Sequence, residues 1–264
     1  MSFAALPRIG QGTWNIESED RAGMVAALRA GLDAGLTHLD TAELYGDGVA
    51  EEIVAEALGD RRAELFLVSK VQPSNASRRG TVTACEGSLR RLKTDHLDCY
   101  LLHWPGAHPL EETLAAFEEL QAAGKIRSYG VSNFDEERLR DAARIAGTGK
   151  LACNQVLFNL AERHIEGRLA PLCRALDIAV VGYSPFMNFK ESPALREVAR
   201  ELGATPRQVA LAFLARIALQ IPKASSVEHV RDNAGALRLR LSTDQIARLE
   251  QAHPLKVRDR LPSA

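Results

Sequence analysis

Short apolar segments alternate with longer amphipathic segments along most of the chain. The apolar segments are bounded by polar turns, which predicts β-strands buried on both faces. The predicted strands cover residues 8–12, 37–40, 65–70, 97–103, 127–131, 152–156, 178–182 and 219–223. The amphipathic segments predict helices at 19–34, 49–58, 78–92, 110–123, 135–146, 164–175, 193–215 and 225–237, with a further helix at 242–251.

Helix-capping residues support several of these helix starts. Ser192 and Thr205 each precede a proline, and Ser242 precedes Thr243 and Asp244, which are patterns typical of helix N-termini. Eight strands that alternate with helices predict parallel βαβ units, and favour a closed (β/α)8 barrel (a TIM barrel) over an open doubly wound sheet. We therefore expect one α/β barrel domain over residues 1–264.

Composition narrows the class of protein. Apolar residues make up 46% and charged residues 25% of the chain, enough to bury a full core. The net charge of −1 and the absence of a basic tail argue against a nucleic-acid partner. No signal-peptide pattern or membrane-spanning apolar run is present. Cysteines 85, 99, 153 and 173 form no CxxC pair, so reduced thiols are expected. We expect a cytoplasmic monomer without a membrane or metal partner.

Polar side chains gather where the predicted strands end. In a barrel of this kind the chemistry sits at the carboxyl ends of the strands. Any one polar residue at a strand end could simply be solvated. Four titratable side chains at three consecutive strand ends, however, indicate a functional site. The residues are Asp40 with Tyr45 in the following loop, Lys70, His103 and Trp104, Ser132 and Asn133, Asn154 and Gln155, residues 183–186, and Pro222 with Lys223.

The four titratable residues at these strand ends, Asp40, Tyr45, Lys70 and His103, can act together. A buried Lys70 ammonium needs a partner, and Asp40 on the neighbouring strand can supply it. Lys70 is expected to lower the pKa of the Tyr45 phenol from about 10. His103 can donate or accept a hydrogen bond at the same place. Such a group donates a proton and stabilises negative charge on a carbonyl oxygen.

Hydride must come from a cofactor, because no side chain can supply it. The glycines at 10 and 12 lack a third glycine and an opening helix, so they do not form a Rossmann site. The segment after the last strand is a better phosphate site: Lys223 precedes a helix start at which Ser225 and Glu228 are expected to form a capping box. A capped helix without a ligand is the other interpretation.

These residues lie in motifs that resemble the aldo-keto reductase family. The motifs run through nearly the whole chain and are specific in their order and spacing. They are LPRIGQGTW at 6–14, GLTHLDTAELYG at 35–46, LFLVSK at 65–70, LDCYLLHWPG at 97–106, GKIRSYGVSNF at 124–134, NQV at 154–156, GYSPF at 182–186 and IPKASSVEHVRDN at 221–233.

The resemblance implies a barrel that uses NADPH or NADH, and a catalytic tetrad of Asp40, Tyr45, Lys70 and His103. In this tetrad, Tyr45 is the general acid. Lys70, paired with Asp40, lowers the pKa of Tyr45, and His103 orients the carbonyl. The nicotinamide would stack on Tyr183. Cofactor contacts are implied at Thr13, Trp14, Asp40, Ser132, Asn133, Gln155, Tyr183, Ser184, Pro185, Phe186, Lys223, Ala224, Ser225, His229 and Asn233.

One departure from the family pattern concerns cofactor choice. Many members carry a serine after the lysine and an arginine five positions further on, which grip the 2′-phosphate of NADPH. Here Ala224 and His229 stand at those positions. NADPH is the expected cofactor, with weakened discrimination against NADH. The segment is most similar to prokaryotic members that reduce methylglyoxal and other small aldehydes.

The resemblance also implies a substrate pocket lined by Trp14, Tyr45, His103 and Trp104. The loop after Phe186 and the tail beyond Pro254 are short, which favours an open site with broad specificity. Two alternatives remain: a cofactor-binding, redox-sensing or regulatory subunit with weak turnover, and a lyase that uses Lys70 as a Schiff base. The complete tetrad and the neighbouring Tyr and His fit reduction better.

Overall fold

The computed structural model describes residues 3–256 and residue 261. Eight parallel strands follow one another around a single sheet in chain order, which confirms the predicted barrel. They are β1 Gln11–Gly12, β2 His38–Asp40, β3 Phe66–Val71, β4 Cys99–Leu102, β5 Tyr129–Ser132, β6 Leu151–Leu157, β7 Ala179–Tyr183 and β8 Leu219–Gln220.

The last strand meets the first and closes the barrel. Parallel bridges join Ile9 to Gln220 and Gly12 to Lys223. The Gly10 amide donates to the Gln220 carbonyl at 2.7 Å, and the Gly12 amide donates to the Pro222 carbonyl at 3.1 Å. The segments beside β1 and β8 therefore lie side by side, although more than 200 residues separate them in the chain.

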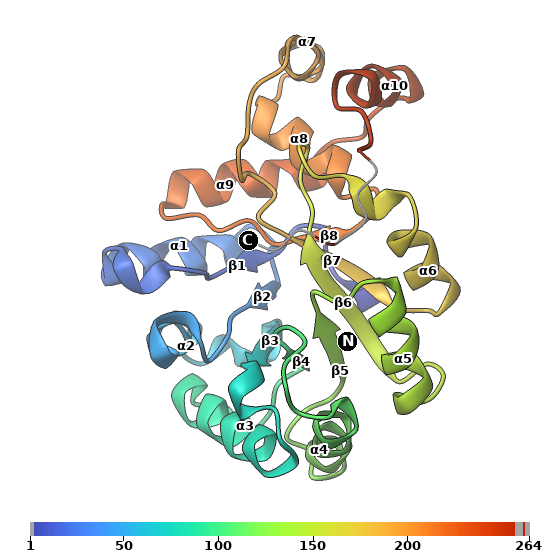
Figure 1. Cartoon of the computed structure of the whole chain (residues 1–264). Helices are drawn as coiled ribbons and strands as arrows, with labels where there is room; N and C mark the ends of the chain where they lie inside the picture. The colour runs from blue at the N-terminus through green and yellow to red at the C-terminus, as the bar shows by residue number, and fades with distance from the viewer. Residues whose placement is uncertain (1–2, 257–260, 262–264) are drawn as a thin grey trace.

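Helices surround the strands, as Figure 1 shows along the barrel. They are α1 Arg21–Asp33, α2 Val49–Leu58, α3 Arg78–Leu92, α4 Leu110–Ala122, α5 Glu136–Ala146, α6 Leu169–Ala175, α7 Pro193–Leu202, α8 Pro206–Leu214, α9 Val227–Gly235 and α10 Thr243–Ala252. Helices α7 and α10 pack against each other outside the ring. Among the described residues, no helix combines the length and the hydropathy that a transmembrane span requires.

Local capping explains where most helices begin, and it corrects two expectations. Ser192, Thr205 and Ser242 accept hydrogen bonds from the first turns of α7, α8 and α10, as predicted. The single helix expected at 193–215 is two helices, because Gly203 takes a left-handed conformation that ends α7. The expected capping box of Ser225 is also wrong, because α9 starts one residue later, with Ser226 as its N-cap.

Two apolar layers hold the barrel together. Alternate residues of β3 divide between them: Phe66 and Val68 face the barrel interior, whereas Leu67 packs outward against the helices. Phe3, in the 3-10 helix η1 (Phe3–Ala5), lies across the amino end of the strands with its ring centroid 4.9 Å from that of Phe66. The interior is thus a packed core, open to chemistry at its carboxyl end. All four cysteines are buried free thiols.

Candidate active site

Strand alternation delivers the predicted catalytic residues to one place. Lys70 follows Phe66 and Val68 at two-residue intervals on β3, so its side chain also faces the barrel interior. Asp40 ends β2, and the register of β2 with β3 sets Asp40 beside Val68. Both side chains are fully buried. The four tetrad residues predicted from the sequence are brought together at the carboxyl end of the barrel.

An ion pair is the centre of this cluster. Lys70 Nζ donates to Asp40 Oδ1 at 2.5 Å and to the Thr41 carbonyl at 2.9 Å. Burial by itself would lower the pKa of Lys70, but the charge of Asp40 and the neighbouring Tyr45 outweigh it, so the pKa of Lys70 is raised. Lys70 is therefore a fixed buried cation beneath the phenol.

Tyr45 stands over that cation. It begins the short helix η3 (Tyr45–Gly48), whose left-handed residues 46 to 48 turn the chain sharply into α2. Its hydroxyl lies 3.4 Å from Lys70 Nζ. Burial raises the pKa of Tyr45, and Lys70 offsets only part of that effect, so the pKa stays above its usual value. The expected net lowering is wrong; Tyr45 is instead held as a protonated phenol, the form that donates a proton.

His103 completes the cluster as a neutral group. Its ring centroid lies 5.6 Å from that of Tyr45 and 4.8 Å from that of Trp104. Burial, with a smaller effect of Lys70, lowers the pKa of His103 to about 2. Its Nδ1 has no hydrogen-bond partner among the described residues. A neutral imidazole beside the phenol can orient a carbonyl without adding charge.

A hydrogen-bond network joins the residues next to the tetrad at the carboxyl end of the barrel, which we call its mouth. The Tyr183 hydroxyl donates to Asn133 Oδ1 at 2.9 Å, and Asn133 Nδ2 donates to the His103 carbonyl at 3.1 Å. Ser132 Oγ donates to the Gln155 carbonyl at 2.9 Å. Asn133 holds a left-handed conformation, with φ of 61°. These four predicted cofactor contacts are thus adjacent and mutually fixed.

Gln155 and Thr13 have roles that sequence patterns did not indicate. The Gln155 amide nitrogen donates to Asp40 Oδ2 at 2.7 Å. Thr13 is buried, and its hydroxyl donates to the Asp40 carbonyl at 2.9 Å. Both predicted cofactor residues therefore also hold Asp40 in place, one through its carboxylate and the other through its backbone.

The remaining predicted cofactor residues lie towards β8 and α9. Ser184 is left-handed, with φ of 52°, and Pro185 is buried. The guanidinium carbon of Arg207 lies 3.6 Å from the ring centroid of Phe186. Lys223 Nζ is 2.5 Å from Glu19 Oε1. Ser225 and His229 are exposed at the start of α9.

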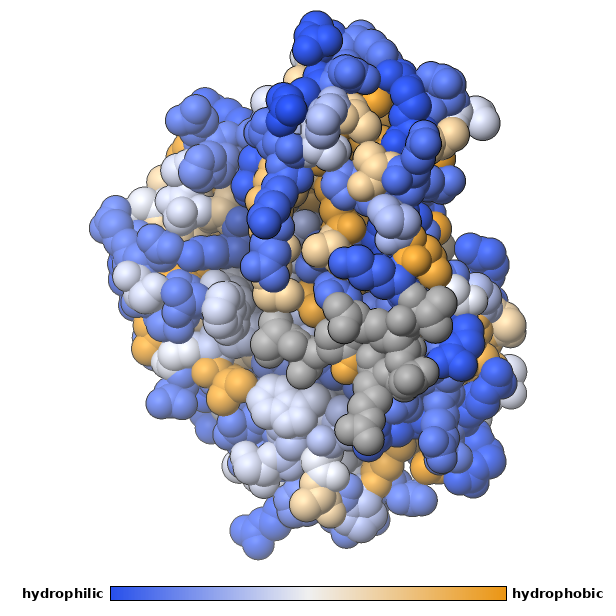
Figure 2. Space-filling view, turned by 45° about the horizontal axis from the view of Figure 1, so that its top comes forward, coloured by the Kyte–Doolittle hydropathy of each residue, from blue (hydrophilic) through white to orange (hydrophobic). Residues whose placement is uncertain are grey.

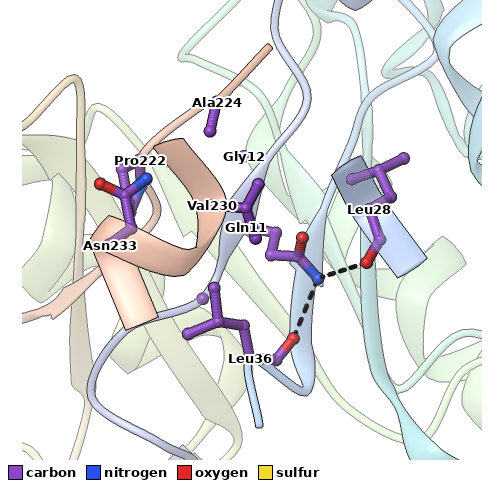
Figure 3. A pocket seen from close by; sticks show the side chains of 9 residues that line it. Gln11, Gly12, Leu28, Leu36, Pro222, Ala224, Val230 and Asn233 are labelled. Atoms are coloured by element: carbon purple, nitrogen blue, oxygen red, sulfur yellow. Dashed lines mark hydrogen bonds between the residues drawn. The ribbon is translucent and has the colours of Figure 1, made fainter. Parts of the chain in front are cut away.

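A small pocket lies beneath this end of the predicted cofactor site. Ala224, Val230 and Asn233 line it from one side and Gln11 from the other (Figure 3). The amide nitrogen of Gln11 donates to the carbonyls of Leu28 and Leu36. Asn233 Oδ1 is buried without a hydrogen-bond partner among the described residues. An orphaned acceptor is what the amino group of an adenine ring would satisfy, so the residues present fit an adenine dinucleotide.

Two of the predicted substrate residues, Trp14 and Trp104, present exposed aromatic side chains. The side chains of Trp14 and Trp104 are 66% and 39% exposed, and Leu44 is also exposed. Figure 2 shows that apolar side chains appear as separate patches on an otherwise mostly hydrophilic face. The short-tail expectation beyond Pro254 concerns mainly residues 257–260 and 262–264, which lie outside the described residues. Trp104 thus offers a flat apolar surface beside His103, and Trp14 follows Thr13, whose hydroxyl donates to the Asp40 carbonyl.

Sequence reasoning missed Glu19, Arg207 and Gln11. Glu19 lies just before α1 and Arg207 in the first turn of α8, where solvated charges are common, and no motif marks them. Their contacts with Lys223 and Phe186 join segments far apart in the chain. Gln11 lies inside the GQGTW motif, which was the available signal for it.

Comparisons with known proteins agree with this arrangement. The model of the aldo/keto reductase family matches residues 8–254. The methylglyoxal reductase YeaE of Escherichia coli is 44% identical over 95% of this chain and 92% of its own length. The glyoxal reductase of Bacillus subtilis is 31% identical over 93% of this chain and 88% of its own. An aldo-keto reductase from Klebsiella pneumoniae, solved in complex with NADPH, superimposes with a TM-score of 0.92 at 45% identity, over 98% of this chain and 95% of its own.

Proposed function

Because this chain belongs to the aldo/keto reductase family, we propose that it reduces small aldehydes such as methylglyoxal to alcohols. It is an NADPH-dependent carbonyl reductase, as the family match and the NADPH complex of a similar structure indicate. One observation carries the proposed chemistry: a buried Lys70–Asp40 pair lies beneath a protonated Tyr45 and beside a neutral His103.

The tetrad residues would divide the work as follows. NADPH, when bound, supplies the hydride for the carbonyl carbon. The Tyr45 phenol donates its proton to the carbonyl oxygen, and the Lys70 ammonium stabilises the negative charge that develops on Tyr45. Asp40 keeps Lys70 in position, and neutral His103 donates a hydrogen bond that orients the carbonyl oxygen.

The cofactor would be held by residues around the rest of the mouth. Ser132, Asn133 and Gln155 would hold the carboxamide, and Tyr183 would stack on the nicotinamide ring. Residues 184–186 would meet the pyrophosphate, and Asn233 the adenine. Lys223 would receive the 2′-phosphate as counter-charge at the start of α9. Trp14 and Trp104 would bound the carbonyl substrate.

The substitution Tyr45→Phe tests this proposal directly. It removes the proton donor and leaves the ring, so carbonyl reduction should fall by about 10²- to 10⁴-fold. NADPH affinity, followed by cofactor fluorescence, should stay within about twofold, below the 0.6 kcal/mol of one RT. Full reduction of methylglyoxal by the variant would contradict the assigned roles. Strong NADPH binding with negligible turnover by the unmodified protein would instead favour a cofactor-binding regulatory subunit.

The proposal also covers the oligomeric state, the cellular location and the domain organisation of the chain. We propose that the chain acts as a monomer in the cytoplasm and forms one domain over residues 1–264. The described helices contain no membrane-spanning candidate. Light scattering of the purified protein would measure the oligomeric state, and fractionation of cells that express it would measure the location.

A further inference from the structure

The loop between β1 and α1 places a carboxylate on the lysine proposed to hold the 2′-phosphate. Glu19 follows the short helix η2 (Ile16–Ser18), where its amide donates to the Ile16 carbonyl at 3.2 Å. Its Oε1 lies 2.5 Å from Lys223 Nζ. Barrel closure brings the two loops together, because Gly12 bridges Lys223. Among the described residues, Glu19 is the acidic partner recorded for Lys223.

The positions next to Lys223 in the sequence add few groups that could bind a phosphate. Ala224 has no hydroxyl, and His229 offers an imidazole where a guanidinium would make bidentate contacts with a phosphate. The Lys223 ammonium is therefore the principal cation of the proposed phosphate site, and Glu19 neutralises it. The pair is partly exposed, with 26% of the Lys223 side chain and 37% of the Glu19 side chain accessible. An ion pair of this kind can be opened at modest cost.

NADPH and NADH would interact differently with the Glu19–Lys223 ion pair. The 2′-phosphate of NADPH must separate Lys223 from Glu19 or stand beside the carboxylate, and like charges repel. NADH brings an uncharged ribose hydroxyl to the same place. A carboxylate accepts hydrogen bonds from ribose hydroxyls, as acidic residues do in NAD-binding Rossmann folds. The carboxylate should therefore disfavour NADPH relative to NADH.

We infer that Glu19 sets the cofactor preference of this chain by competing with the 2′-phosphate for Lys223. The inference rests on the proposed function, because it takes Lys223 as the phosphate contact. Glu19 does not touch the reacting atoms; it acts on specificity through Lys223. Discrimination between NADPH and NADH is then weaker than Lys223 by itself would provide.

The test is a binding measurement on Glu19→Gln, without a carbonyl substrate. Dissociation constants are measured for NADPH and NADH, and for 2′,5′-ADP and 5′-AMP as probes of the adenosine end. Loss of the carboxylate should tighten NADPH and 2′,5′-ADP binding by about two- to fivefold, the range of a partly exposed charge interaction. NADH and 5′-AMP should bind no more tightly. The same variant should raise the kcat/KM ratio of NADPH over NADH by a similar factor.

Two further variants separate competition at Lys223 from a general charge effect. Glu52→Gln removes the same charge from an exposed position on α2, and should leave the preference unchanged. Lys223→Met should abolish the gain that Glu19→Gln produces, since the effect acts through the ammonium. Equal tightening of both cofactors, an unchanged NADPH affinity or a gain that persists without Lys223 would each overturn the inference. A protein that binds neither cofactor would overturn the proposed function itself.

Discussion

The side-chain amide of Gln155 donates a 2.7 Å hydrogen bond to Oδ2 of Asp40, from β6 to β2 across the interior of the barrel. Asp40 directs its other oxygen to Lys70 at 2.5 Å. The carboxylate is thus held from two sides, and Gln155 completes the setting of the ion pair beneath Tyr45. A residue expected to touch the cofactor also holds Lys70, the lysine of the proposed tetrad, through its counter-ion.

Replacing Gln155 by Met should therefore affect both stability and catalysis. The buried Asp40 oxygen would lose its donor, a change that costs about 1–3 kcal/mol. Urea unfolding should show this loss, and kcat should fall because Lys70 is less firmly held. The exposed Gln251→Met is the matched control and should stay within about 0.5 kcal/mol of the unmodified protein. A Gln155→Met protein with unchanged stability and kcat would argue against this positioning role.

Asp40→Asn should be strongly destabilising. It leaves the fully buried Lys70 ammonium without its counter-charge, which costs about 3–5 kcal/mol for a buried pair. The double variant Asp40→Asn with Lys70→Met removes the unpaired charge, so it should recover part of that stability, although both proteins should lack carbonyl reduction. Chemical denaturation measures the difference. Equal stability of the single and double variants would show that the buried charge is not the cause.

Acid should destabilise the protein through His38. Its ring is buried between Phe3 and Phe66, and burial lowers the pKa of His38 to about 4. The unfolded state, with an ordinary pKa of about 6.5, binds the proton first. The contribution of His38 to the free energy of unfolding is therefore fully present above about pH 6.5. It is lost as the pH falls towards 4, by about 3 kcal/mol in all.

Denaturation between pH 7 and pH 4 would measure this contribution in His38→Leu against the unmodified protein. The variant should lose less stability over the interval, because an uncharged side chain takes up no proton on unfolding. His108→Leu, at an exposed position, should keep the full pH dependence. If His38→Leu retained it as well, the acid sensitivity would have to come from other groups.

Ala224→Ser combined with His229→Arg should strengthen the preference for NADPH. Position 224 lines the pocket at the start of α9, and position 229 is exposed in the first turn of the helix. An arginine can bind a phosphate through two parallel hydrogen bonds, which favours a gain of about tenfold in the NADPH to NADH ratio of kcat/KM. Steady-state kinetics with one aldehyde and both cofactors would check it. A ratio that does not change would place the 2′-phosphate away from these positions.

Local patterns in the sequence were sufficient to predict the barrel and to place the four residues of the proposed tetrad together at its carboxyl end. Helices α2 and α3 begin and end where the amphipathic pattern places them, and Ser192, Thr205 and Ser242 cap helices as expected. The break at Gly203 was also a local signal, but the continuous amphipathic pattern obscured it. These features depend on residues only a few positions apart, and strand periodicity likewise directs Lys70 to the barrel interior.

Contacts between distant segments decided the remaining properties. The bond from Gln155 to Asp40 spans 115 positions and the pair of Glu19 with Lys223 spans 204, so neither has a signature in a local pattern. The direction of the Tyr45 pKa likewise depends on burial, which outweighs the nearby Lys70 charge. Strand periodicity is therefore enough to show which residues reach the carboxyl end of the barrel. Their charge states and partners follow from the folded arrangement, because desolvation and ion pairing depend on everything packed around a group.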